Sequence, residues 1–223
     1  YLCNLASELS TVPRITAKVF APLHVNQNLT KLSSELSSGR IVNQLPLRLL
    51  RLTMFASKTM ARREMVRFKP DIVHETYYSD EDFRPNEARR VLTVYDLIHE
   101  RYPDLFINSA GTTRPKHAAA KRVDHVICIS ESTRRDLVSY CGIPEEKTSV
   151  VYLGVDVNFE EAAEPSKFYS TRPFLLYVGA RGGYKNFERF IRAFAHSARL
   201  RQEFNLLCFG GGQFKNAERQ MIA

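Results

Sequence analysis

A loop rich in glycine and basic residues lies between an apolar run and an amphipathic pattern near residue 180. Its glycines allow the backbone to approach a ligand closely, and its two cations supply positive charge. The helix expected next would add unpaired N–H groups and the positive end of its dipole. Together these features are typical of an anion site, most often one for phosphate. The residues concerned are Gly179, Gly182, Gly183, Arg181 and Lys185.

The same loop is also compatible with a solvated turn that carries two ordinary surface cations, because basic turns are common. Its sequence, GARGGYKN, matches neither the Walker pattern nor GxGxxG. The cofactor classes associated with those two motifs are therefore not supported.

A strand before the loop and a helix after it must position these residues. Phe174–Val178 is continuously apolar, which predicts a buried strand. Apolar residues then recur at intervals of three and four, which predicts a helix with one buried stripe. The stripe comprises Phe187, Phe190, Ile191, Phe194, Ala195 and Ala198.

Strands and helices are predicted to alternate along the rest of the chain as well. Short apolar runs such as ITAKVFA, VLTV, DHVICI and SVVY predict strands. Because these runs are continuous, both faces of each strand should be buried, as in a parallel sheet covered by helices. The predicted fold class is α/β with two Rossmann-like domains, the second incomplete. The predicted boundaries are 1–156 for the first domain, 157–173 for a linker, and 174–223 for the first part of the second domain.

Composition excludes several classes of protein. The chain has 223 residues, 44% of them hydrophobic and 25% charged, which is ordinary for a globular protein. No apolar run approaches the roughly 20 residues needed to span a bilayer. The net charge of +8 suits anionic partners, but no zinc-finger spacing or RNP-like motif supports nucleic acid. The four cysteines form no CxxC pair, so we expect a reducing, cytoplasmic environment and no metal site.

Both ends of the sequence resemble interrupted elements. Residues from Tyr1 to Leu9 follow a helical pattern from the first position, and 216–223 enter another helix and stop. These patterns favour a fragment of a longer protein. The alternative is a compact chain with frayed termini.

Four segments of the chain, in register over 71–212, resemble retaining glycosyltransferases of the GT-B fold, group 1, also called family four. The segments are DIVHETYYS, VLTVYDLIHERYPDLF, VDHVICISESTRRDLVSYCGIPEEKTSVVYLGVD and FLLYVGARGGYKNFERFIRAFA. The third is the most specific of them. The YDLIHE variant is most similar to bacterial enzymes that make surface polysaccharide, often mannosyltransferases.

The resemblance implies an enzyme that transfers a sugar from a nucleoside-diphosphate sugar to a glycan or lipid-linked acceptor. The donor would lie between two Rossmann-like domains and be held mostly by the second. Arg181 and Lys185 match the family's Arg and Lys, which neutralise the diphosphate. Cations at this position stabilise charge that develops on the leaving group. Family members need no metal for this step, so no cofactor is expected.

The chain departs from the family pattern near the reacting sugar. Many members carry His-Asp where this chain has Tyr95-Asp96. Tyr95 can donate a hydrogen bond but cannot act as an imidazole, and His99 is a candidate to compensate. Asp96 follows a predicted strand, and ligands of open α/β sheets bind at the carboxyl ends of strands. The alternative role for Asp96 is to cap a turn. The family's later donor motif is expected beyond residue 223, and the glycine loop before its first helix is missing.

Two further features have open interpretations. The segment 45–69 is basic and amphipathic, which suits contact with an anionic membrane; the alternative is a helix packed on the core with a solvated basic face. His74 ends the run DIVH and is predicted to lie on the acceptor side, with a structural histidine as the alternative.

Two other functions compete with the transferase. Tyr95 and the missing segments favour a non-catalytic or truncated nucleotide-sugar-binding module. A nucleotide-sugar epimerase of similar two-domain fold is a third possibility, and it would isomerise the free donor without an acceptor.

Overall fold

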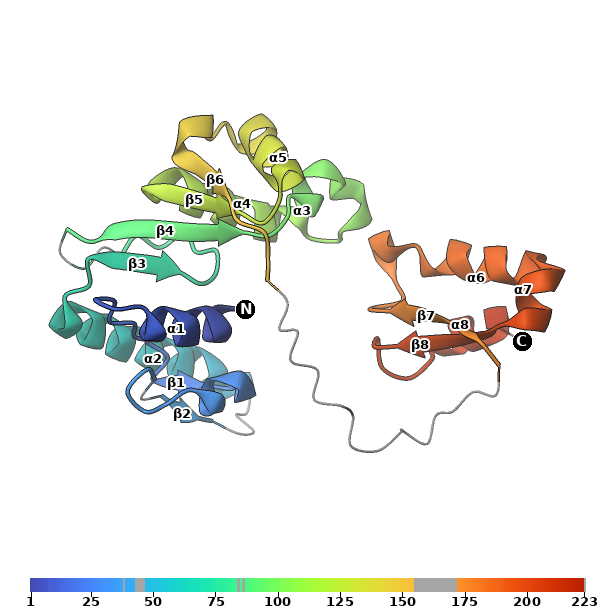
Figure 1. The fold of residues 1–223 in the computed structure, drawn as a ribbon, viewed down its shortest axis with the longest axis horizontal. Helices are drawn as coiled ribbons and strands as arrows, with labels where there is room; N and C mark the ends of the chain where they lie inside the picture. Colours follow the sequence, from blue (N-terminus) through green and yellow to red (C-terminus); the bar gives the residue numbers. More distant parts are fainter. Residues whose placement is uncertain (38, 43–46, 84, 86, 155–171, 223) are drawn as a thin grey trace. The chain divides into compact units, whose positions relative to one another are not determined.

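The structure is a computed structural model that describes residues 1–223 except 38, 43–46, 84, 86, 155–171 and 223. Internal contacts divide the chain into two units (Figure 1). The first comprises Tyr1–Arg101 and Asn108–Leu153, and the second comprises Tyr102–Ile107 and Gly154–Ala223. Most of the predicted linker, 157–173, lies outside the described residues.

Helices and strands alternate along both units. Up to residue 153 the elements are α1 (Leu2–Thr11), β1 (Leu23–His24), β2 (Arg40–Ile41), α2 (Leu47–Phe68), β3 (Ile72–Glu75), β4 (Arg89–Val94), α3 (Ile98–Arg101), α4 (Ser109–Arg122), β5 (His125–Cys128), α5 (Glu131–Cys141) and β6 (Thr148–Val150). After it they are β7 (Phe174–Val178), α6 (Phe187–His196), α7 (Ala198–Glu203), β8 (Asn205–Phe209) and α8 (Asn216–Ile222). Short 3-10 helices are η1 (Gln27–Lys31), η2 (Pro103–Leu105), η3 (Glu145–Lys147) and η4 (Gly183–Lys185).

The main sheet of the first unit is parallel throughout, with the order β3-β4-β5-β6 (Figure 1). β4 lies between β3 and β5, and its Leu92 and Val94 are fully buried. This arrangement confirms the predicted α/β class with parallel sheets. The strands β1 and β2 form a separate parallel pair.

The strand predicted at 15–21 is not formed. Val19 makes only an isolated bridge with Ser37, and β1 begins later, at Leu23. A short apolar run becomes a strand only where a partner strand and a packing surface lie beside it. Ile15 stays exposed, so this run lacks that surface.

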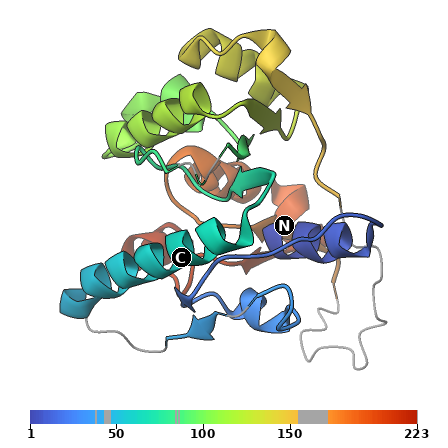
Figure 2. The ribbon, with the colours of Figure 1, turned by 90° about the vertical axis from the view of Figure 1, so that its left-hand side faces the viewer.

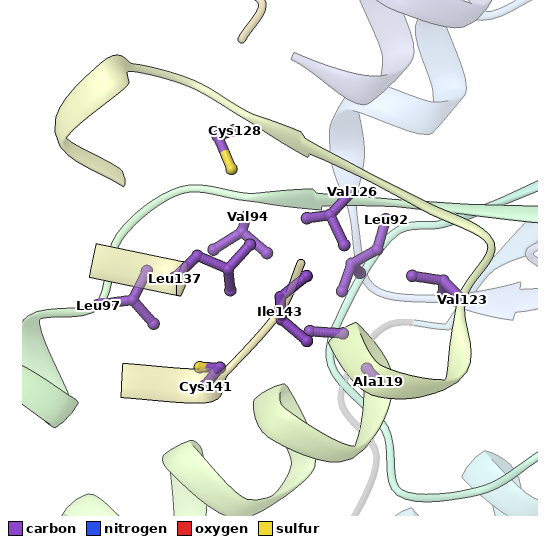
Figure 3. Packing of buried hydrophobic residues seen from close by; sticks show 11 residues of the cluster. Leu92, Val94, Leu97, Ala119, Val123, Val126, Cys128, Leu137, Cys141 and Ile143 are labelled. Atoms are coloured by element: carbon purple, nitrogen blue, oxygen red, sulfur yellow. The ribbon is translucent and has the colours of Figure 1, made fainter. Parts of the chain in front are cut away.

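The core of the first unit lies between β4 and β5 on one side and α4 and α5 on the other. In Figure 3 the side chains of Leu92, Val94 and Val126 point toward Leu137 and Ile143. Cys128 and Cys141 also belong to this cluster, and both are free thiols. Burial raises the pKa of Cys128 to about 11 and that of Cys141 to about 12. These thiols therefore stay protonated at neutral pH and act as packing groups.

Helix α5 has a capping residue at each end. Ser130 Oγ accepts a hydrogen bond from the N–H of Thr133, as a serine N-cap does. Gly142 ends the helix in the left-handed region, with φ 63° and ψ 31°. Both ends were predicted from the sequence.

Gly142→Ala should lower the free energy of unfolding by about 1 kcal/mol, because a Cβ in the left-handed region is strained. The space around Gly142 is open, so the cost comes from the backbone and not from a clash. Urea unfolding measures the effect, with exposed Ser139→Ala on the same helix as the control. A Gly142→Ala variant as stable as that control would contradict the interpretation.

The second unit is built on the parallel pair β7–β8, and α6 packs on one face of it (Figure 1). Tyr177 on β7 contacts the rings of Phe187 and Phe190 on α6. The prediction that β7 is buried on both faces is wrong in the described structure. Exposed and partly covered residues alternate along β7, and Leu176 and Val178 are 54% and 60% exposed. Helix α6 covers only the opposite face of the strand, which carries Tyr177.

The helix predicted after the glycine-rich loop is divided in two. Phe187 and Ile191 are buried, as the periodic pattern predicts. The helix stops at His196, however, and Ser197 caps a new helix, α7, by accepting a hydrogen bond from the N–H of Leu200. Serine competes with the helical backbone for hydrogen bonds, which explains the break.

Helix α2, the cyan-to-teal helix of Figure 2, confirms the helix predicted near 45–69. Ser57 Oγ exchanges two hydrogen bonds with the backbone of Leu23 and so ties α2 to β1. The opposite face remains open, with Leu52 66% and Phe55 72% exposed. In the described residues, no helix combines the length and apolar character needed to cross a bilayer.

Candidate functional site

The loop after β7 leads directly into η4 and α6. Gly179 has a φ of 131° and Gly183 a φ of 61°, conformations that favour glycine. Gly182 has a φ of −119°, which any residue can adopt, so its conformation does not require glycine. A Cβ at Gly182 or Gly183 would meet nothing within 4 Å, which leaves open space beside the backbone. The backbone therefore has the accessibility that the predicted anion site needs.

Lys185 is the exposed cation of this loop. Its side chain lies across Gly179, and a Cβ built on Gly179 would lie only 2.8 Å from Lys185 Nζ. The glycine thus makes room for the ammonium group at the carboxyl end of β7. No carboxylate of the described residues forms an ion pair with Lys185. Within the described part of the chain, its charge is therefore open to an anionic ligand.

Arg181, the other predicted cation, is in a different environment. Its side chain is only 3% exposed and forms an ion pair with Glu218 on α8, with 3.1 Å between Arg181 Nε and Glu218 Oε1. Its guanidinium also donates to four consecutive carbonyl oxygens of the loop after β8. These are the carbonyls of Gly210, Gly211, Gly212 and Gln213, at 2.6, 3.3, 2.9 and 3.0 Å. Phe214 stacks beside the guanidinium, 4.3 Å from ring centroid to Cζ.

The carboxylate of Glu218 is itself held by a further donor. Its Oε2 accepts a hydrogen bond of 2.6 Å from the backbone N–H of Lys215. That bond, followed by the bond from Arg181, lowers the pKa of Glu218 below its usual range. Glu218 is therefore ionised at neutral pH and pairs with Arg181 through Nε of the guanidinium.

The loops after β7 and β8 lie side by side. Both strands are parallel and end at the same edge, and Gly179 N–H donates to Phe209 O at 2.9 Å. A Cβ on Gly210 would lie 3.4 Å from the backbone of Gly179, so the two loops are in van der Waals contact. Ligands of open α/β sheets bind at this edge.

In the first unit, Tyr95, Asp96 and His99 follow β4, at the carboxyl end of its sheet. Asp96 is exposed, and its Oδ1 accepts a hydrogen bond of 3.3 Å from Ile98 N–H at the start of α3. Asp96 therefore caps a turn while the residue remains exposed to solvent. Tyr95 is half-buried, and its ring meets that of Tyr1 edge-on at 6.1 Å. Burial, and then Tyr1, raises the pKa of Tyr95, so its hydroxyl stays protonated and can donate.

The backbone of this loop is held by side chains from three other segments. Tyr95 O accepts from Thr133 Oγ1 at 3.1 Å, and Asp96 O accepts from Lys116 Nζ at 2.9 Å. Tyr95 N–H donates to the hydroxyl of Tyr78 at 3.4 Å, and burial raises the pKa of that hydroxyl. Sequence reasoning did not find these supports. The signal for Thr133 was its place in the ISEST segment that carries the resemblance. Lys116 gave no such signal, because a lysine in a polar helix is usually exposed.

Lys116 and Glu100 form a buried ion pair beneath the loop. Lys116 Nζ lies 3.0 Å from Glu100 Oε2, and the two side chains are 1% and 3% exposed. Glu100 Oε1 lies 3.5 Å from His117 Nε2, and Lys116 Nζ lies 5.4 Å from the centre of the Tyr78 ring. Each of these buried charges is stabilised by the other, because an unpaired charge without water around it would cost a large free energy of desolvation.

His74 lies in β3, one residue before the strand ends, and packs against the neighbouring strand. Its Nε2 lies 2.9 Å from Thr93 Oγ1, and Thr93 is buried on β4. This contact provides a structural role for His74. The predicted acceptor-side role stays a prediction.

Burial lowers the pKa of His74 below its ordinary value of 6.5. Below that value the unfolded chain binds a proton that the folded protein resists, so stability should fall as the pH drops from about 6.5. The slope from one such group is at most about 1.4 kcal/mol per pH unit. His74→Gln should lessen this fall in urea unfolding between pH 7.5 and 5.5. At pH 7.5 the two proteins differ only in packing, and parallel pH profiles would contradict the prediction.

A hollow of about 500 Å³ lies elsewhere in the first unit, between the β1–β2 pair and α2. Its lining includes Phe20, Leu23, His24, Met54 and Ser57. None of the predicted site residues lines it. Within the described part of the chain, no group of three His, Cys, Asp or Glu residues could hold a metal ion.

Comparisons with known proteins agree with this architecture. The chain is 28% identical over 109 residues to the O-antigen chain mannosyltransferase RfbU of Salmonella typhimurium, a match over 48% of this chain and 29% of that protein. The fold is similar to that of MnaA from S. aureus, solved with UDP, at a TM-score of 0.52 and 15% identity. That match covers 99% of this chain and 60% of MnaA, so the chain spans less than two thirds of either protein.

The family comparison is more extensive than the match to RfbU. The model for Glycosyltransferase Family 4 matches residues 33–159, which include β3 to β6 and the loop with Tyr95 and Asp96. The matched range exceeds half of the chain. The predicted resemblance is thereby confirmed, as is an α/β fold of the GT-B type, and this chain belongs to Glycosyltransferase Family 4.

Proposed function

We propose that this chain is part of a retaining glycosyltransferase, which transfers a sugar from a nucleoside-diphosphate sugar to a glycan or lipid-linked acceptor. Membership of Glycosyltransferase Family 4 supports the reaction class. The similarity to an O-antigen mannosyltransferase supports mannose as the sugar and surface polysaccharide as the product. UDP in the MnaA structure is a ligand of the proposed class.

The exposed Lys185, which pairs with no carboxylate of the described residues and lies beside two glycine-rich loops, is the observation that carries this proposal. In sugar transfer the nucleoside diphosphate leaves with increasing negative charge. An ammonium group already in place stabilises that charge without reorganisation. The start of α6 adds N–H groups, because Asn186 makes no side-chain cap there. The chemistry proposed for this loop needs no metal or other cofactor.

The loop after β4 is proposed to border the reacting sugar. The Tyr95 hydroxyl can donate to a sugar oxygen, and the exposed oxygen of Asp96 can accept from a sugar hydroxyl. His99 belongs to the same proposed site. The buried supports Thr133 and Lys116 would keep the loop in one shape during the reaction.

A transfer assay with the full-length protein tests the reaction. Labelled nucleoside-diphosphate sugars are incubated with a lipid-linked acceptor, and the anomeric configuration of the product is determined by NMR. Transfer with retention supports the proposal, and transfer with inversion removes the retaining assignment. Isomerised free donor without transfer would identify an epimerase.

A nucleotide-sugar-binding module without catalysis is the second candidate, favoured by Tyr95 at the position where many family members carry His. Calorimetric titration with nucleoside diphosphates separates the two functions. Binding without any transfer would support the module.

Peripheral contact of α2 with an anionic membrane, from the cytoplasmic side, is a further part of the proposal. Leu52 and Phe55 are exposed, and Arg63 and Arg67 lie on the same helical face. This combination suits lipid head groups that carry negative charge. Flotation with anionic liposomes should recover the protein at low salt, and recovery that ignores lipid charge and salt would exclude this contact.

A further inference from the structure

Arg181 is buried under the glycine-rich loop after β8, and this position bears on the proposed donor site. A guanidinium has five N–H donors and no acceptor. The carbonyls of 210–213 and the carboxylate of Glu218 accept from Nε, Nη1 and Nη2, which engages up to four of these donors. With its side chain 3% exposed, Arg181 has little capacity left for a ligand.

The Gly210–Gln213 loop needs a cation beside its carbonyl groups. Gly210, Gly211 and Gly212 have φ values of 91°, 72° and 69°, three consecutive left-handed residues. Their carbonyls, with that of Gln213, converge on one guanidinium, and four carbonyl dipoles directed at one point repel each other unless a cation lies there. Arg181 supplies that cation, and Glu218 and Phe214 hold it in place.

The peptide plane then determines where the N–H groups of this loop point. All peptide bonds of the described chain are trans, so each carbonyl and the N–H of the next residue point in opposite directions. Carbonyls of 210–213 directed at Arg181 therefore direct the N–H groups of 211–214 away from it. Within the described residues, no backbone carbonyl accepts a hydrogen bond from these four N–H groups. They are displayed on the outer side of the loop.

We propose that Arg181 is a positioning residue, which holds the Gly210–Gln213 loop so that its outward N–H groups bind acceptor atoms of the donor nucleotide. Lys185 is then the side chain that contacts the diphosphate, and Arg181 acts through the loop. This inference rests on the proposed function for its ligand. It differs from the role that the family resemblance implies for Arg181, which is direct contact with the diphosphate.

The contacts of Arg181 predict which substitutions at Arg181 and Glu218 no longer hold the Gly210–Gln213 loop. Arg181→Lys keeps the positive charge but has three donors on one nitrogen, which cannot reach four carbonyls and Glu218 at once. Glu218→Gln keeps the size of the side chain and removes the charge that anchors Arg181. If Arg181 bound the diphosphate directly, Glu218→Gln would release it and leave donor affinity unchanged or tighter. If Arg181 positions the loop, Glu218→Gln should weaken donor binding.

The first experiment measures hydrogen–deuterium exchange in the full-length protein without ligand. The peptide that covers 210–215 should exchange about tenfold faster in Arg181→Lys and in Glu218→Gln than in the wild type. Lys185→Ala should leave this peptide unchanged, as should Arg199→Lys, a matched control on the exposed surface of α7. Unchanged exchange in both test variants would overturn the positioning role. Unfolding in urea identifies any variant that fails to fold.

The second experiment measures the affinity for a nucleoside diphosphate and for the free nucleoside by calorimetry. Arg181→Lys and Glu218→Gln should each weaken nucleoside diphosphate binding about fivefold to tenfold. Tighter or unchanged binding in Glu218→Gln would overturn the inference in favour of direct contact. Binding of neither compound by the wild type would contradict the proposed function, and the exchange experiment would still decide whether Arg181 holds the loop.

Discussion

Lys185→Ala in the full-length protein should weaken the binding of a nucleoside diphosphate by about 10- to 100-fold. Hydrogen bonds to charged groups contribute roughly 1.5–3 kcal/mol, and each 1.4 kcal/mol is a factor of ten in affinity. The ammonium group has no carboxylate partner in the described residues and lies over Gly179 at the carboxyl end of β7. If the proposed site holds the diphosphate, the substitution removes the exposed side-chain cation that this loop offers it, and turnover should fall with affinity because the same charge develops further in the transition state.

The matched control for this change is Arg199→Ala. Arg199 also carries one positive charge, and its side chain is 82% exposed on α7, where it pairs with Glu203. A general effect of net charge would weaken both variants equally. Calorimetric titration at two salt concentrations distinguishes these outcomes. Equal affinities of the wild type and Lys185→Ala would count decisively against the diphosphate site.

Lys116→Met should lower the free energy of unfolding by about 3–5 kcal/mol, the usual cost of leaving one partner of a buried ion pair unpaired. The variant keeps the length of the side chain but removes the charge that neutralises Glu100. It also removes the donor to Asp96 O, so the loop after β4 loses one of its supports. Such a change is a large share of the 5–15 kcal/mol that stabilises a typical domain.

The comparison that tests this explanation is Lys121→Met, the same substitution on the exposed side of α4. It should change the unfolding free energy by less than about 0.5 kcal/mol. The double variant Lys116→Met with Glu100→Leu should recover at least half of the loss, because no buried charge then remains unpaired. Urea unfolding at pH 7 provides all three values. A single variant within about 1 kcal/mol of the wild type would show that the pair is not buried as described.

The elements around the proposed site were predicted from sequence most accurately where local chemistry decides the structure. The strand–loop–helix arrangement around Lys185 follows from the apolar run, the glycines and the amphipathic stripe, and the structure contains it. Ser130 and Gly142 were identified as the ends of α5 because caps depend on residue type alone. The break at Ser197 was missed, since the apolar stripe continues across it.

Burial was the property that sequence reasoning predicted least well. Arg181 and Lys185 are four residues apart, with the same charge, and the sequence assigns them the same role. Only the structure separates them, because the loop after β8 and α8 enclose Arg181 and leave Lys185 exposed. In the same way Lys116 resembles any surface lysine of a polar helix until the fold places it over Glu100.

The order of apolar runs, glycines and caps was thus enough to predict an α/β chain and to locate its basic loop, whereas the resemblance of four segments over 71–212 indicated the glycosyltransferase family. These signals act over a few residues, and a linear pattern contains them completely. Which cation faces solvent and which holds a neighbouring loop depends on contacts between segments about 30 residues apart, such as Arg181 with 210–213. Such contacts form only when parallel strands align their carboxyl ends, so the tertiary structure alone assigned Lys185 and Arg181 their different environments.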